Sequence, residues 1–129
     1  MFDHVVVAIV DNPSKSPMFT AGERVKLFEE IYGDRIEVTS FSGLLVDHVR
    51  EVGVDTVIKG LRTSDDFEYE TQMAQMNRHL TGMETVFVVT RPDLRFVSSS
   101  LVKEVARLGG SVSGLVPDVV ENALKERLQ

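Results

Sequence analysis

Residues 4–10 read HVVVAIV, an almost unbroken apolar run, and residues 11–14, DNPS, end it with turn-forming residues. A continuous apolar strand is typical of a parallel sheet that is covered on both faces. Thr20 and Glu23 follow with the spacing of a helix capping box, and helical periodicity continues to about Ile31. This stretch therefore predicts a strand, a loop and a helix in succession, which is the repeating unit of an α/β fold.

The same alternation continues to the end of the chain. We predict strands over 36–41, 56–58 and 85–90, and helices over 44–51, 66–80, from Ser98 or Ser99 to Leu108, and from Pro117 to Glu126. Strands that alternate with helices form parallel βαβ units. The fold class is therefore α/β, an open parallel sheet with helices on both faces, in a single domain of residues 1–129. Ligands of such sheets bind beyond the carboxyl ends of the strands, which selects segments 11–19, 42–45, 59–66 and 91–100.

The composition excludes several classes of protein. The 129 residues include 14 Lys and Arg, 20 Asp and Glu and no cysteine, for a net charge of −6. The absence of cysteine excludes a disulfide scaffold, a thiolate metal site and a cysteine nucleophile. The acidic balance argues against a general nucleic-acid coat. No segment has the apolar length of a membrane helix and the start does not resemble a signal peptide, so we expect a cytoplasmic protein without a membrane partner.

Five of the 14 cations fall in the segments where a ligand is expected, although the chain as a whole is acidic. These cations are Lys15, Lys59, Arg62, Arg91 and Arg95. Three consecutive serines, Ser98, Ser99 and Ser100, stand at a predicted helix start, where free backbone N–H groups bind phosphate. The residues by themselves therefore favour an α/β domain that binds a phosphorylated ligand.

Each of these features also has a purely structural interpretation. The serines can act only as a helix cap, and the cations can be ordinary solvated charges. The acidic residues of segment 65–70, which are Asp65, Asp66, Glu68 and Glu70, suit a helix start, although Glu70 can also face a ligand. Met73, Met76 and Leu80 form a helical stripe that indicates either core or a subunit contact. The chain lacks the glycine-rich loops of common nucleotide-binding motifs, and its three histidines are too scattered to suggest a zinc site.

Four blocks of sequence resemble the phosphopantetheine adenylyltransferases. They are NPSKSPMF at 12–19, KGLRTSDDFEYE at 59–70, QMAQMNRH at 72–79 and FVSSSLVKE at 96–104. Their order and spacing agree with the family over nearly the whole chain, and the second and fourth blocks are the most specific. The resemblance implies a Rossmann-like nucleotidyltransferase fold. It also implies adenylyl transfer from ATP to 4′-phosphopantetheine, which gives dephospho-coenzyme A and pyrophosphate in coenzyme A biosynthesis.

The resemblance also implies roles for individual residues. Lys15 and Arg62 resemble the family's catalytic cations. The implied ATP-binding residues are Gly60, Leu61, Arg62, Glu70, Leu94, Arg95, Phe96, Val97, Ser98, Ser99 and Ser100. The implied residues for phosphopantetheine are Lys15, Leu45, Lys59, Tyr69, Met73 and Asn77. Mg²⁺ would enter with ATP, coenzyme A would be a feedback ligand, and the family's assembly would be a homohexamer.

The sequence departs from the family at its start. Family members begin with a strand, a Gly-Thr/Ser-Phe-Asp-Pro-x-Thr-x-Gly-His loop and a helix, whereas residues 1–4 here correspond to the end of that helix. The loop carries the family's transition-state histidine, so we expect the sequence as written to be weakly active or inactive. In the family's strand order, 3-2-1-4-5, the missing strand is central, and we expect its loss to separate the first two strands here from the last two. We favour a start codon further upstream; the alternative is a shortened chain that pairs its first and third strands directly.

Four functional hypotheses follow. The first is an enzyme of the phosphopantetheine adenylyltransferase type. The second is a non-catalytic, truncated paralogue that binds ATP or coenzyme A. The third is another nucleotidylyltransferase, such as a cytidylyltransferase or a nicotinamide-mononucleotide adenylyltransferase, and the fourth is a non-functional fragment.

Overall fold

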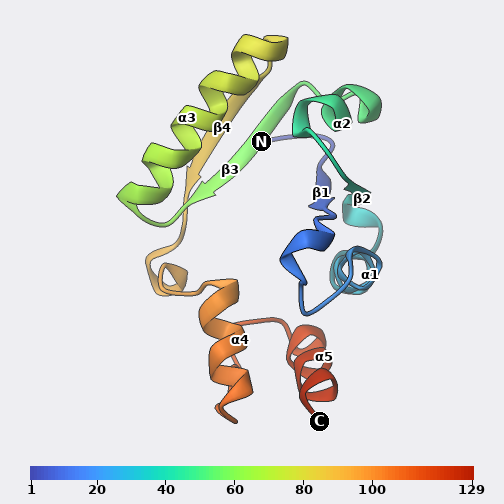
Figure 1. The fold of residues 1–129 in the computed structure, drawn as a ribbon, viewed down its shortest axis with the longest axis vertical. Helices are drawn as coiled ribbons and strands as arrows, with labels where there is room; N and C mark the ends of the chain where they lie inside the picture. The colour runs from blue at the N-terminus through green and yellow to red at the C-terminus, as the bar shows by residue number, and fades with distance from the viewer. The chain divides into compact units, whose positions relative to one another are not determined.

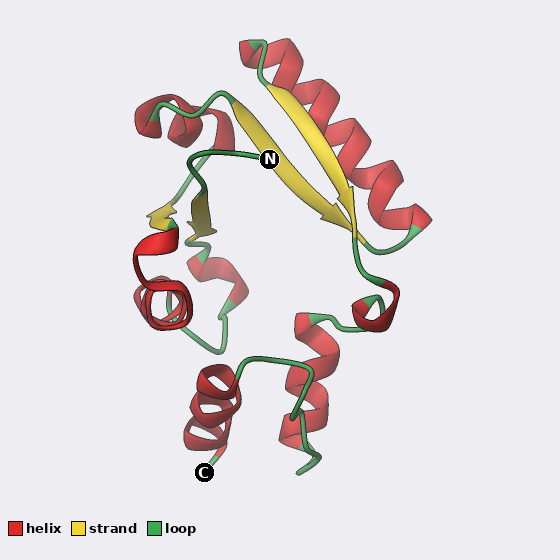
Figure 2. Cartoon of the chain, turned by 180° about the vertical axis from the view of Figure 1, so that it is seen from behind, coloured by secondary structure: helices red, strands yellow, loops and turns green.

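The computed structural model describes residues 1–129, except for the side chain of Pro13. The strands are β1 (Val6–Val10), β2 (Glu37–Phe41), β3 (Thr56–Leu61) and β4 (Glu84–Val89). The α-helices are α1 (Ala21–Tyr32), α2 (Leu45–Val52), α3 (Ser64–Thr81), α4 (Ser99–Arg107) and α5 (Asp118–Leu128). Short 3-10 helices are η1 (Pro13–Lys15), η2 (Gly33–Arg35) and η3 (Pro92–Leu94). The chain forms two compact units, Met1–Ser42 with Ser99–Gln129, and Gly43–Ser98 (Figures 1 and 2).

The first unit is built on the parallel pair of β1 and β2, in register from Val6 opposite Glu37 to Val10 opposite Phe41. Helix α1 packs on both strands, and α5 packs on α1 and α4. The start of α1 is fixed by a complete capping box: the Thr20 hydroxyl accepts from the Glu23 backbone N–H, and Glu23 accepts from the backbone N–H of Thr20. This confirms the helix start that the Thr20–Glu23 spacing predicts.

The second unit is built on the parallel pair of β3 and β4, in register from Thr56 opposite Glu84 to Leu61 opposite Val89. Helix α3 packs along both strands and is the crossover between them (Figure 1). The ring of Phe67 on α3 meets that of Phe87 on β4 edge to face, at 5.9 Å between centroids. A small core of Val46, Val49 and Met83 joins α2 to this layer, with Leu45, Val54 and Val57 packed against it.

The element order and the parallel pairing agree with the sequence predictions, while some boundaries differ. Strand β3 continues to Leu61 because its pairing with β4 extends through Gly60 and Leu61. Helix α3 begins at Ser64, two residues earlier than predicted, because Thr63 is the cap and its hydroxyl accepts from the Asp66 N–H at 3.1 Å. Helix α5 begins at Asp118, and Pro117 lies just before it instead of at its first position.

The four strands form two separate two-stranded sheets, β1 with β2 and β3 with β4. This confirms the expected separation of the first two strands from the last two. Direct pairing of β1 with β3 was the alternative, and it is not found among the described residues. Two-stranded sheets bury few side chains and depend on packed helices for their stability. Accordingly Val10 on β1 and Ile58 and Val88 on β3 and β4 remain partly exposed.

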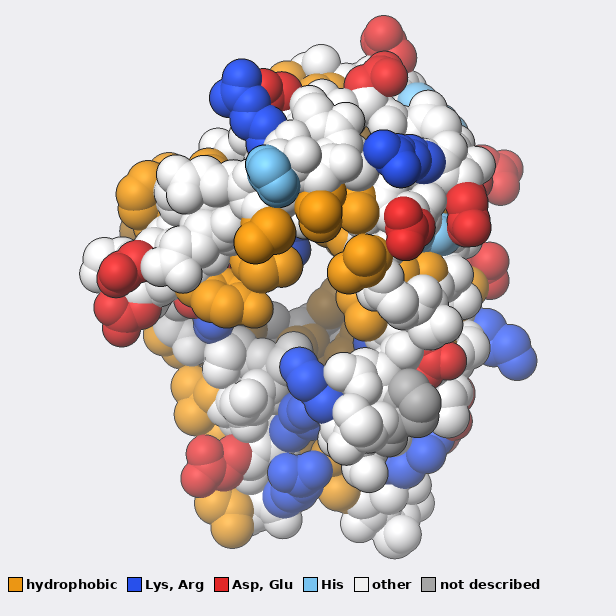
Figure 3. All heavy atoms as spheres, turned by 45° about the horizontal axis from the view of Figure 1, so that its top comes forward, with side chains coloured by type: hydrophobic (Ala, Val, Ile, Leu, Met, Phe, Trp, Pro, Cys, Tyr) orange, Lys and Arg blue, Asp and Glu red, His pale blue; other side chains and the backbone are white. Residues whose placement is uncertain are grey.

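Hydrophobic side chains are visible at the molecular surface between charged ones (Figure 3). On α3, Met73, Met76 and Leu80 are each exposed over two fifths or more of their area, with Met73 at 41%. The interpretation of this stripe as core is therefore wrong for the single chain, and the subunit-contact interpretation remains a prediction. In the part of the chain that the structure describes, no helix combines the length and apolarity needed to cross a bilayer.

Replacement by alanine is expected to change the stability of the protein in opposite directions at two glycines. Gly82 ends α3 at φ +77°, a conformation that strains any residue with a Cβ. Gly22 lies in the first turn of α1, where a new Cβ would make only an ordinary 4.0 Å contact with Thr20 Oγ1. We expect Gly82→Ala to lower the free energy of unfolding by about 1 kcal/mol and Gly22→Ala to raise it by about 0.5 kcal/mol. Urea midpoints followed by circular dichroism measure both, and equal shifts in one direction would contradict this account.

Candidate active site

The carboxyl ends of β3 and β4 lie at one edge of their sheet because the two strands are parallel. A cleft of about 350 Å³ opens at this edge. Two of the segments selected from the sequence, 59–66 and 91–100, contribute most of its lining. The lining residues are Leu61, Arg62, Thr63, Ser64, Val89, Thr90, Pro92 and Arg95.

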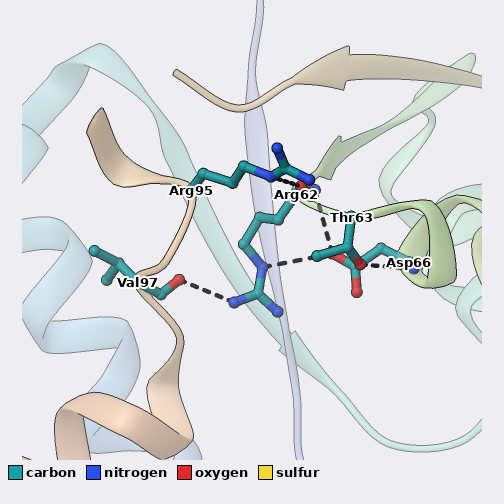
Figure 4. A network of polar contacts seen from close by, with 5 residues as sticks. All are labelled: Arg62, Thr63, Asp66, Arg95 and Val97. Carbon is teal, nitrogen blue, oxygen red and sulfur yellow. Dashed lines mark hydrogen bonds and ion pairs between the residues drawn. The ribbon is translucent and has the colours of Figure 1, made fainter. Parts of the chain in front are cut away.

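Arg62 joins the loops that follow the two strands (Figure 4). Its Nη1 donates to the Val97 carbonyl at 2.9 Å, a contact that spans 35 residues of sequence. In return, Arg95 Nε donates to the Arg62 carbonyl at 2.8 Å. Because each arginine binds backbone of the other's loop, the two predicted ATP-binding segments are held together by reciprocal hydrogen bonds.

Asp66 fixes the orientation of Arg62 from the first turn of α3. Its Oδ2 accepts from the Arg62 backbone N–H at 3.2 Å and lies 3.5 Å from Arg62 Nε. A guanidinium carries five N–H donors, so the contacts with Val97 and Asp66 leave several of them for an anion. The side chain is 37% exposed, which keeps those donors accessible from the cleft.

Lys59 and Glu70, both implied as ligand contacts, form an ion pair with Nζ and Oε2 3.6 Å apart. Lys59 precedes Gly60 on β3, and Glu70 lies on α3, which packs against that strand. Both side chains are partly buried, so this pair is less screened than a fully exposed one. A phosphate that binds Lys59 must therefore compete with the carboxylate of Glu70.

The other residues implied by the resemblance lie in several elements. Tyr69 and Met73 are exposed on α3, whereas Asn77 on the same helix is only 8% exposed. Leu45 is the first residue of α2 and packs against the core of the second unit. Leu94 closes η3, and Phe96 is exposed in the loop that follows it.

Lys15 and the serines occupy loop and helix-start positions, as predicted. Lys15 is exposed at the end of η1, in the first unit. Helix α4 begins at Ser99, so Ser99 and Ser100 are its first residues and Ser98 precedes it. These positions agree both with a helix cap and with a phosphate site formed by the serines. That Lys15, Ser99 and Ser100 share one nucleotide with Arg62 stays a prediction.

Several residues of the cleft were not among those predicted from the sequence. Thr63, Ser64 and Thr90 line it, and Asp66 orients Arg62. The T-x-x-D spacing from Thr63 to Asp66 was a usable signal, because it marks the helix cap that brings Asp66 back to Arg62.

Arg91 has a different environment from Arg62 and Arg95. It pairs with Asp93 of its own loop, with 2.7 Å between Arg91 Nη2 and Asp93 Oδ2, and it is mostly exposed. This favours the surface-charge interpretation of Arg91. Within the described residues, no three His, Asp or Glu side chains are grouped as metal ligands.

Comparisons with known proteins give a consistent result. Residues 1–105 match the family described as cytidylyltransferase-like. A protein of Frankia casuarinae named phosphopantetheine adenylyltransferase is 52% identical over 134 residues, covering 99% of this chain and 83% of the relative. A protein of Alkaliphilus metalliredigens with the same name is 52% identical over 130 residues, covering 98% of this chain and 83% of the relative.

The reciprocal contacts of Arg62 predict a local effect on the loop after β4. We expect Arg62→Ala to speed amide hydrogen exchange at residues 95–97 by roughly tenfold, because that loop loses its charge-assisted hydrogen bond to β3. Arg91→Ala is the matched control, since the side chain that it removes is bonded to Asp93 of its own loop. Equal exchange in the two variants would show that Arg62 does not hold the loop.

Proposed function

Since this chain belongs to the phosphopantetheine adenylyltransferase family, we propose that it transfers the adenylyl group of ATP to 4′-phosphopantetheine, giving dephospho-coenzyme A and pyrophosphate. The observation that carries the proposal is the cleft at the carboxyl ends of β3 and β4, where Arg62 is bonded to the segment before the serines. The hydrogen bond from Arg62 to Val97 joins the two blocks of sequence that are most specific to the family, 59–70 and 96–104.

Adenylyl transfer requires alignment of two anionic substrates and no covalent intermediate with the protein. The phosphate of phosphopantetheine attacks the α-phosphorus of ATP in line, and pyrophosphate leaves. The protein lowers the barrier by positioning the reactants and by neutralising charge that develops on the phosphoryl oxygens. A guanidinium held by Asp66 and Val97 is suited to this work, because its remaining donors are already oriented before ATP binds.

The proposed ATP contacts are Gly60, Leu61, Arg62, Glu70 and residues 94–100. Gly60 has no side chain and lies on the strand that leads into the cleft, so a nucleotide can approach its backbone closely. Lys15 is proposed to bind phosphates of both substrates from its exposed position on the loop after β1.

For phosphopantetheine, the proposed contacts are Lys59 for the phosphate and Leu45, Tyr69, Met73 and Asn77 for the pantetheine arm. The ion pair of Lys59 with Glu70 supports this role for Lys59. When the substrate binds, its phosphate replaces the Glu70 carboxylate as the partner of the Lys59 ammonium group.

Mg²⁺ is proposed to enter with ATP and not to occupy a site made by the protein alone. Two acidic residues of α3, Asp66 and Glu70, are each already paired with a cation. When bound, Mg²⁺ would neutralise phosphate oxygens and keep part of its water shell.

Assembly into a homohexamer, in the cytoplasm, is also proposed, as is feedback binding of coenzyme A. The exposed stripe of Met73, Met76 and Leu80 supports a subunit contact, since apolar side chains gathered on one helix face are costly to leave in water. The single catalytic domain expected over residues 1–129 is part of the same proposal.

A non-catalytic module that binds ATP or coenzyme A is the second candidate. It is the alternative that the analysis of the residues left open beside the enzyme. The direct test is pyrophosphate release from ATP and 4′-phosphopantetheine, together with calorimetric binding of each substrate. Tight binding without turnover supports the module, and turnover with CTP in place of ATP would support another nucleotidylyltransferase.

In a form that turns over, we expect Arg62→Ala to raise the KM for ATP and to lower kcat by roughly 10²–10³, the usual effect of losing one preorganised donor. Arg62→Lys should recover only part of this loss, because a lysine cannot reproduce the planar fork. Steady-state kinetics measure both effects, with Arg91→Ala as the control. Unchanged kinetics in Arg62→Ala would exclude the side chain from the reaction.

The proposed role of Lys59 predicts a selective effect on the second substrate. We expect Lys59→Ala to raise the KM for 4′-phosphopantetheine by roughly tenfold while leaving the KM for ATP nearly unchanged, since one charged contact to phosphate is lost. Arg78→Ala is a suitable control, because Arg78 forms an exposed ion pair with Glu84 near the other end of α3. Equal changes in both KM values would contradict a specific contact with phosphopantetheine.

A further inference from the structure

The loop that carries Lys15 is attached to its unit at both ends. At its start, the Asp11 backbone N–H donates to the Phe41 carbonyl at 2.7 Å, and Arg24 Nη2 donates to the Val10 carbonyl at 3.0 Å. At its end, Thr20 caps α1 through the reciprocal bonds with Glu23. Arg24 and Glu23 are neighbours in the first turn of α1, so the position of that turn controls both attachments.

Arg127 of the C-terminal helix α5 holds the first turn of α1 and the end of the loop together. Its Nη2 donates to Glu23 Oε1, a contact that spans 104 residues of sequence, while Glu23 Oε2 accepts from the Thr20 N–H. The same guanidinium lies over the ring of Phe19, with Cζ 5.3 Å from the ring centroid. One side chain therefore contacts both the last residue before the cap and the carboxylate that completes the cap.

The electrostatics of Glu23 agree with this arrangement. The hydrogen bond from the Thr20 backbone, followed by that from Arg127, holds the pKa of Glu23 below its ordinary value. The two oxygens of the carboxylate thus bind different partners: one binds the cap residue Thr20 and the other binds Arg127 of α5.

The backbone between the two attachments is strained directly after Lys15. Ser16 has φ +44°, a conformation that residues other than glycine rarely adopt. Such strain persists only where the surrounding structure holds it in place. Here the turn of η1 adds bonds from Ser14 Oγ to Asn12 Oδ1 at 2.6 Å and from the Lys15 N–H to the Asn12 carbonyl at 3.2 Å.

From these contacts we infer that Arg127 is a positioning residue, which fixes the loop of residues 11–19 and thereby the direction in which Lys15 reaches its phosphates. The effect on catalysis rests on the proposed function, whereas the restraint on the loop does not. A contact from α5 would thus make the C-terminal helix part of the machinery that places a cation of the active site.

The first experiment is independent of activity. Limited trypsin digestion of the full chain, followed by mass spectrometry, reports the rate of cleavage after Lys15. We expect Arg127→Ala to raise this rate about three- to tenfold, because an exposed ion pair and a cation–π contact are lost. Lys125→Ala is the matched control: Lys125 lies on the same helix and pairs with Glu121 of that helix, with 2.9 Å between Nζ and Oε1. Equal cleavage after Lys15 in the two variants would overturn the inference.

A second variant covers the case in which Arg127→Ala fails to fold, as shown by circular dichroism. Glu23→Gln keeps a side chain that can complete the capping box but removes the charge that faces Arg127. We expect it to raise cleavage after Lys15 by a smaller factor, with the melting temperature almost unchanged. Cleavage at the rate of the unaltered chain would again contradict a restraint through this pair.

The third measurement separates positioning from a merely structural role. In a form that turns over, we expect Arg127→Ala to lower kcat about tenfold without a matching loss of thermal stability, and Arg127→Lys to restore part of it. An active protein whose kcat is insensitive to Arg127 would overturn the catalytic part of the inference while the proposed function stands. If Arg127→Ala raises cleavage after Lys15 but no form of the protein releases pyrophosphate, the proposed function is refuted. The inference that Arg127 restrains the loop then still stands.

Discussion

Parallel pairing of neighbouring strands is the constraint on which the candidate site depends. When β3 and β4 run in the same direction, their carboxyl ends and the loops that follow must lie at one edge. The connection between them must also cross the sheet, and α3 supplies it. The cleft and the reciprocal bonds of Arg62 and Arg95 follow from this geometry. An antiparallel pair would have placed the two loops at opposite ends of the sheet.

Three cations of the candidate site, Lys59, Arg62 and Arg95, are already engaged by carboxylates or carbonyls. Arg62 bonds to Val97 and lies beside Asp66, and Lys59 pairs with Glu70. Such contacts reduce the net free energy that a phosphate gains on binding, because an existing interaction is replaced and not simply added. In exchange, the side chains are oriented before the substrate arrives, and preorganised charge contributes more to a transition state than charge that must first be ordered.

The two-stranded sheets account for part of the exposed apolar surface. In a sheet of two strands, both strands are edge strands. The faces of such a sheet are covered only where a helix packs on them. Ile58, Val86 and Val88 alternate on one face of the β3–β4 sheet with residues that face α3, and they remain partly exposed. Helix α3 is likewise only partly covered within the chain, since one of its 18 described residues, Asn77, is buried.

The sequence by itself determined the order of the elements, their parallel character and the cap at Thr20, because strand runs and helix caps depend on residues a few positions apart. It also selected the loops that form the cleft, since every strand of a parallel sheet ends at the same edge. Only the tertiary structure decided which cations are engaged: Arg62 with Val97, Arg91 with its own Asp93, and Arg127 with Glu23 and Phe19. The contacts of Arg62 and Arg127 join segments 35 and 104 residues apart, and no local spacing encodes them. They arise from the packing of helices and strands. This packing fixes the distance between side chains that are far apart in the sequence.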